Sequence, residues 1–142
     1  MASPEILEKL MTANRIMATD PEKGFDILLP AIMPPEFVAQ HPEVKAMMVA
    51  GAKMLPPTPA ETADRAMAGI QQFNAYDRLP QIKCPVLIVH GDKDVLVLPE
   101  NANLIKSRIP QAELYIIAGA GHAFQAADPI GIHQKIAEWL RN

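Results

Sequence analysis

The apolar run from Pro85 to Gly91 constrains the fold of this chain more than any other segment. It is rich in β-branched residues and nearly continuous, which is typical of a strand that is covered on both faces. A helix is predicted from Pro99 to Arg108, where Pro110 stops it, and a second strand from Glu113 to Ala118. Strand, helix and strand with short loops imply parallel pairing through a right-handed crossover. The sequence therefore predicts an α/β arrangement here, closed by a final helix.

The part of the chain before residue 76 is predicted to consist of helices only. Proline at the first helical position marks the beginning of successive helices, at Pro4, Pro21, Pro35 and Pro42. The second of these helices is predicted to end at Pro30. Thr58 and Glu61 have the spacing of a capping box, which predicts one more helix with an apolar face formed by Ala63, Ala66, Met67, Ile70 and Phe73.

Composition excludes several classes of protein. Hydrophobic residues make up 49% of the 142 residues and charged residues 20%, which is typical of a globular domain. The net charge is -3 and the basic residues are scattered, so we expect no nucleic-acid partner. No apolar run approaches the ~18 residues of a membrane span, and the first residues do not have the pattern of a signal peptide. Cys84 is the single cysteine, so we expect no intrachain disulfide and a cytoplasmic location.

An acidic residue follows the first predicted strand. Asp94 lies just past Gly91, at the carboxyl end of the strand, which is where ligands bind in open parallel sheets. A carboxylate at this position can hold a histidine in one tautomer and stabilise its charged form. The alternative is an acidic turn, in which Asp92 or Asp94 only bonds its own backbone.

A histidine follows the second predicted strand at the same edge of the sheet. His122 lies in the glycine-rich loop Gly119-Ala120-Gly121-His122. Histidine acts as both base and acid near neutrality, because its ordinary pKa is about 6.5. A loop histidine can also be an ordinary surface residue, but its pairing with Asp94 across one strand–helix–strand unit favours a catalytic role.

The other candidate side chains are weaker. His41 precedes a proline, His133 is predicted to face solvent, and His90 is predicted to be a satisfied, half-buried strand residue. No pair of histidines has the helical spacing of a zinc motif, so we expect no metal, and no glycine-rich phosphate loop predicts a cofactor.

Neither serine of the 142 residues has the setting of a catalytic nucleophile. That residue is expected in a Gly-x-Ser-x-Gly turn between a strand and a helix. Ser3 is predicted to cap the first helix and Ser107 lies inside a helix, both without flanking glycines. Cys84 lies at the opposite end of the first strand from Asp94, roughly 20 Å away at ~3.3 Å per residue.

Residues 76–142 resemble the C-terminal part of the α/β-hydrolase superfamily, with similarity to esterase, enol-lactonase and haloperoxidase-like members. The similarity extends along the chain in order, through Tyr76–Asp94, Leu98–Asn101, Ile109–Leu114, Gly119–His122, Asp128–Pro129 and Ala137–Leu140. By this resemblance Asp94 is the acid and His122 the base of a Ser-His-Asp triad. Residues 1–75 resemble the helical cap of such hydrolases, and residues 76–142 their C-terminal core segment.

The resemblance leaves three functions open. The chain is expected to be inactive alone if it is a fragment of an ester or lactone hydrolase whose N-terminal half carries the serine. It is otherwise a non-catalytic module that binds a partner or associates with itself, as a dimer or larger, or one half of a split hydrolase. The self-association hypothesis depends on the first strand, because an inner strand that has lost a neighbour exposes unpaired backbone groups.

Overall fold

The computed structural model of the protein describes residues 3–126 and 129–141. The chain forms two compact units that divide between Asn74 and Ala75. No helix within the described ranges is both long and apolar enough to cross a membrane. The cap role expected for the first unit stays a prediction.

The first unit is entirely helical. Its helices are α1 (Pro4–Met17), α2 (Pro21–Ile32), α3 (Pro35–Gln40), α4 (Pro42–Lys53) and α5 (Ala60–Gln72). The predicted proline starts are confirmed for the first four helices, and Ser3 caps α1 as predicted, with its Oγ accepting the Ile6 N–H. Helix α2 contacts α1 and α4, and α1 also contacts α5. The buried apolar residues of this unit are Ala13, Phe25, Leu29, Ala31, Met33 and Val49.

In the first unit two helix boundaries differ from the prediction, the end of α2 and the start of α5. Helix α2 continues past Pro30 to Ile32, because proline removes one N–H from the last turn while Met33 N–H still bonds to Leu29 O at 2.8 Å. The buried side chain of Leu29 helps to keep this turn packed.

The predicted capping box is wrong. Helix α5 begins at Ala60, after an extended Pro59 (φ −57°, ψ 137°) that occupies the N-cap position without any side-chain bond. A capping box with Glu61 requires Thr58 at the N-cap position. Thr58 lies one residue before that position, which Pro59 occupies. The predicted apolar face of α5 is also only partly covered, because Phe73 is 69% exposed.

The second unit contains the sheet. Its elements are η1 (Tyr76–Gln81), β1 (Leu87–Gly91), α6 (Glu100–Arg108), β2 (Glu113–Ile117), η2 (Phe124–Ala126) and α7 (Pro129–Trp139). Strands β1 and β2 are parallel, as predicted, with Leu87 opposite Glu113 and Gly91 opposite Ile117. In the described part of the chain the sheet has these two strands, so the other edge of β1 has no strand beside it.

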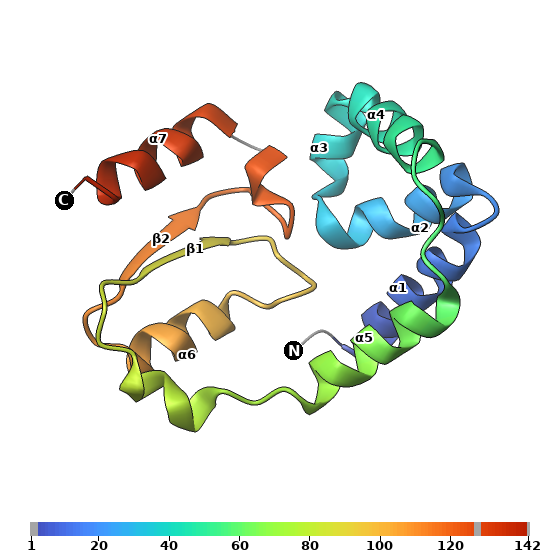
Figure 1. The fold of residues 1–142 in the computed structure, drawn as a ribbon. Helices are drawn as coiled ribbons and strands as arrows, with labels where there is room; N and C mark the ends of the chain where they lie inside the picture. The colour runs from blue at the N-terminus through green and yellow to red at the C-terminus, as the bar shows by residue number, and fades with distance from the viewer. Residues whose placement is uncertain (1–2, 127–128, 142) are drawn as a thin grey trace. The chain divides into compact units, whose positions relative to one another are not determined.

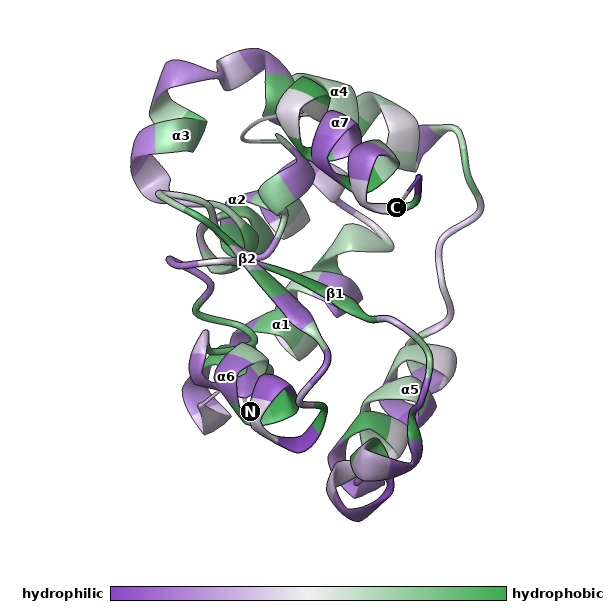
Figure 2. Ribbon diagram, turned by 90° about the vertical axis from the view of Figure 1, so that its left-hand side faces the viewer, coloured by the Kyte–Doolittle hydropathy of each residue, from purple (hydrophilic) through white to green (hydrophobic). Residues whose placement is uncertain are grey.

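Helices α6 and α7 lie on opposite faces of this sheet (Figure 1). Hydrophobic residues occupy much of both strands (Figure 2), and on the α7 side Ile132 packs with Ile117 and Ala120. Asp128, the predicted cap of α7, lies outside the described residues. Because the strands are parallel, their carboxyl ends and the loops that follow them meet at one edge of the sheet.

Candidate active site

Backbone hydrogen bonds join the two loops at the carboxyl ends of the strands. Asp92 N–H donates to Ile117 O at 3.2 Å, and Lys93 N–H donates to Ala120 O at 2.9 Å. The Asp92 side chain adds a third link, because its Oδ1 accepts the Gly119 N–H at 2.7 Å. Gly119 has φ +75°, a backbone conformation that glycine adopts without strain. The loop after β1 and the loop after β2 are thereby held against each other.

Gly91 makes this close approach possible. A Cβ atom at this position would lie 2.5 Å from Gly121 O and nearer still to Ala120 O. Only glycine therefore lets the end of β1 contact the backbone that leads to His122.

Asp94 is buried and held by three hydrogen bonds. The residue is 4% exposed. Its Oδ1 accepts the backbone N–H of Leu96 at 2.9 Å and of Val97 at 2.8 Å, and its Oδ2 lies 2.9 Å from His122 Nδ1. The carboxylate bonds its own loop with one oxygen and the histidine with the other, so it does more than bond its own backbone, while its catalytic role stays a prediction.

His122 presents one ring nitrogen to Asp94 and leaves the ring accessible. A carboxylate only accepts hydrogen bonds, so Nδ1 carries a hydrogen, and in the neutral ring Nε2 then carries a lone pair. The side chain is 42% exposed. This arrangement can remove a proton from a hydroxyl group placed beside Nε2 and return it later.

His90 lies next to this pair. Its Nε2 is 2.8 Å from Val97 O and 3.5 Å from Asp94 Oδ2, and its side chain is 13% exposed. The prediction that it is satisfied and half-buried is confirmed. The sequence analysis missed its position beside the acid, although its spacing of four residues from Asp94 was a usable signal.

The two serine hydroxyls take part in helix contacts, and the single thiol precedes β1. Ser3 caps α1, and Ser107 Oγ donates to Leu104 O within α6 at 2.7 Å. Cys84 is exposed and precedes β1, at the end of the strand opposite to Asp94. Across the described ranges there is no group of three or more side chains suited to holding a metal ion.

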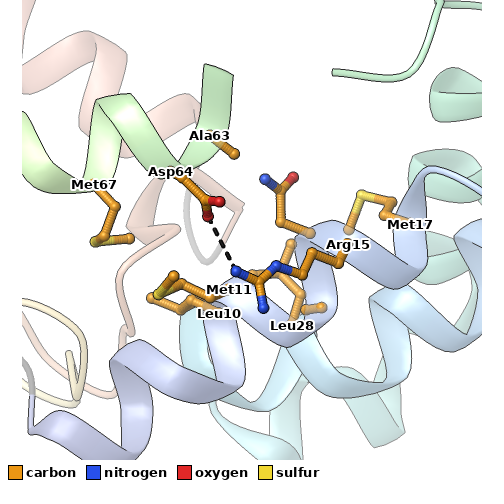
Figure 3. A pocket seen from close by; sticks show the side chains of 10 residues that line it. Leu10, Met11, Arg15, Met17, Leu28, Ala63, Asp64 and Met67 are labelled. Atoms are coloured by element: carbon orange, nitrogen blue, oxygen red, sulfur yellow. Dashed lines mark hydrogen bonds and ion pairs between the residues drawn. The ribbon is translucent and has the colours of Figure 1, made fainter. Parts of the chain in front are cut away.

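The first unit contains a cavity of about 260 Å³ between α1, α2 and α5 (Figure 3). Arg15 and Asp64 form an ion pair at 3.3 Å in its wall. The lining is otherwise mainly apolar: Leu10, Met11, Ala13, Asn14, Met17, Leu28, Ala63 and Met67. Its one carboxylate, Asp64, is paired with Arg15, so the cavity offers mainly apolar space for a ligand.

Comparison with known proteins gives one consistent picture. A family model described as "alpha/beta hydrolase fold" matches residues 14–129. A thermophilic esterase from Thermogutta terrifontis is 28% identical with a TM-score of 0.72, and the match covers 98% of this chain and 51% of the esterase. An enol-lactonase from Burkholderia xenovorans LB400 shares the fold, with a TM-score of 0.78 at 20% identity over 99% of this chain and 52% of the lactonase.

Shorter matches occur among curated proteins. Lipase 1 of Psychrobacter immobilis is 48% identical over 44 residues, which are 31% of this chain and 14% of the lipase. The chain therefore spans about half the length of the solved structures that it matches, and it matches a smaller part of this lipase.

Proposed function

The chain belongs to the α/β-hydrolase fold family, and on that premise we propose that it carries the acid and the base of a serine-type hydrolase for carboxylic esters or lactones. Asp94 is the acid and His122 is the base. One observation carries the proposal: a buried carboxylate, fixed by two backbone N–H groups, lies 2.9 Å from Nδ1 of a histidine whose ring is accessible.

The proposed chemistry follows from this geometry. Nε2 of His122 takes the proton of a serine hydroxyl while the serine oxygen attacks the carbonyl carbon of the ester. His122 then gives this proton to the departing alkoxide, and the same steps with water release the acid product. Asp94 stabilises the imidazolium that forms between the two transfers, because its carboxylate is already aimed at Nδ1.

The nucleophile and the oxyanion donors are proposed to come from a segment outside these 142 residues. Ser3 and Ser107 are engaged in helix contacts, and neither follows a strand. The serine segment is either joined to this chain or supplied by a separate polypeptide, and residues 1–75 act as the cap. The 142 residues alone are expected to be inactive.

A complementation experiment tests this proposal. The chain is assayed with p-nitrophenyl butyrate by itself and after fusion behind the N-terminal half of the Thermogutta terrifontis esterase. We expect background hydrolysis from the chain alone and turnover from the fusion. His122→Ala lowers the turnover of the fusion by a factor on the order of 10⁴ or more.

The matched control is His133→Ala, which removes an exposed histidine of α7 and leaves turnover unchanged. Circular dichroism checks that every fusion is folded, and the N-terminal half is also added as a separate polypeptide in case the fusion misfolds. Turnover by the chain alone that a serine-directed phosphonate blocks would refute the proposal, as would a folded, active fusion that is unaffected by His122→Ala.

A second candidate function is a non-catalytic module that associates with itself. The observation in its favour is the edge of β1 that has no strand beside it in the described part of the chain. An isolated pair of strands is marginally stable, and pairing this edge with a second copy would extend the sheet. Size-exclusion chromatography with light scattering tests this candidate, and a folded monomer at micromolar concentration counts against it.

A further inference from the structure

His90 has a fixed hydrogen-bonding role inside the second unit. Its Nε2 lies 2.8 Å from Val97 O, and a carbonyl oxygen only accepts hydrogen bonds. Nε2 therefore carries the ring hydrogen and donates it to Val97. The side chain is 13% exposed and lies on β1, so the donor is held by the sheet.

The acceptor of this bond belongs to the residue that also holds the acid. Val97 N–H donates to Asp94 Oδ1 at 2.8 Å while Val97 O accepts from His90. A continuous series of contacts thus runs from β1 through Val97 to Asp94, and from Asp94 Oδ2 to His122 Nδ1. His90 Nε2 is also 3.5 Å from Asp94 Oδ2, so this donor lies beside the acid as well as beside Val97 O.

Two of the three apolar side chains in the segment 94–97 give it little packing support, since Leu96 alone of them is partly buried. The side chains of Val95 and Val97 are 42% and 38% exposed. The segment nevertheless has to keep Asp94 Oδ2 aimed at His122, since a catalytic arrangement tolerates displacements of only about 0.5 Å. The bond from His90 supplies the restraint that the exposed valines do not.

We propose that His90 is a positioning residue, which anchors the segment 94–97 to β1 and so keeps Asp94 aimed at His122. This inference rests on the proposed function of the pair. His90 itself does not touch the reacting atoms, and it acts by restricting the position and orientation of the acid.

The test compares His90→Gln with His90→Met in the 142-residue chain. The two side chains have the same length, but only glutamine carries an N–H donor near the position of Nε2. Nitrogen-15 NMR of the histidine rings gives the tautomers directly. In the unchanged protein we expect His90 to carry its hydrogen on Nε2 and His122 on Nδ1.

The His90→Gln variant should keep the hydrogen of His122 on Nδ1. The His90→Met variant should shift His122 toward the Nε2–H tautomer, which an imidazole without a fixed partner prefers. His133→Met serves as the matched control, because it changes an exposed histidine on α7 and should leave the signals of His122 unchanged.

A hydrogen on Nδ1 of His90 in the unchanged protein would overturn the positioning role. An unaltered His122 tautomer in folded His90→Met would also overturn it. So would an equal loss of the Nδ1–H tautomer of His122 in His90→Gln and His90→Met. If His90→Met fails to fold, the His90 tautomer and the His90→Gln variant decide the question. A His122 without its Nδ1 hydrogen in the unchanged protein would refute the proposed function, and this inference with it.

Discussion

Replacing the buried acid separates its structural role from its proposed chemical role. In Asp94→Ala, the backbone N–H groups of Leu96 and Val97 lose their acceptor, in a region that is only partly open to solvent. Leaving a buried donor unsatisfied costs about 1–3 kcal/mol. With two donors and partial access of water, we expect the free energy of unfolding to fall by about 2–4 kcal/mol.

Asp94→Asn should behave differently. The amide oxygen can still accept both N–H groups in place of Oδ1, so the loss of stability should be about 1 kcal/mol. The amide nitrogen now faces His122 at the position of Oδ2, and it donates where the carboxylate accepted. His122 is then forced into the Nε2–H tautomer, which cannot remove a proton from a nucleophile, and turnover of the complemented hydrolase should fall by about 10⁴.

Urea unfolding followed by circular dichroism measures the stability of both variants, and nitrogen-15 NMR measures the tautomer of His122. The reasoning fails if Asp94→Ala unfolds at the same urea concentration as the unchanged protein. It also fails if Asp94→Asn keeps the hydrogen of His122 on Nδ1, because the amide would then not be facing the ring.

Three further predictions follow from the same structure. Gly91→Ala should lower stability by about 1–3 kcal/mol in urea unfolding, because its Cβ meets backbone oxygens; the matched control Gly69→Ala, in open space on α5, should raise stability by about 0.5–1 kcal/mol. Ile132→Ala should cost about 3 kcal/mol in the same assay, since this side chain is 1% exposed in the core. The Lys23 backbone N–H and ammonium lower the pKa of Asp20. The ionised Asp20 carboxylate therefore contributes to stability above about pH 4, and this contribution is lost as pH falls through the lowered pKa. Asp20→Asn should flatten the acid limb of a curve of stability against pH.

Local sequence signals predicted the helices where a single residue type dictates the backbone. Proline at the first helical position has a fixed φ and needs no N–H partner, so the starts of α1 to α4 were readable. The end of α2 was not readable, because the burial of Leu29 outweighs the single hydrogen bond that Pro30 removes. The predicted start of α5 was wrong, because the extended Pro59 occupies the N-cap position in place of Thr58.

The pair at the candidate site was predictable as to position, while its detailed contacts were not. The parallel strands place Asp94 and His122 at one edge of the sheet, and the resemblance of residues 76–142 to α/β-hydrolases was confirmed at the level of the family. The role of His90 depends on how the segment 94–97 folds back toward β1. That turn is set by hydrogen bonds between backbone and side chains, which leave no periodic pattern in the sequence.

The backbone bonds that join the two loops bear on how such a chain can diverge. The bonds from Asp92 to Ile117 and from Lys93 to Ala120 use only N–H and C=O groups, which every residue except proline possesses in full. Substitutions at Lys93, Ile117 and Ala120 that keep the N–H therefore leave these two bonds in place, whereas Asp92 also contributes its carboxylate to the Gly119 N–H. Gly91 is the opposite case, because any side chain at this position would meet the backbone oxygens of the second loop.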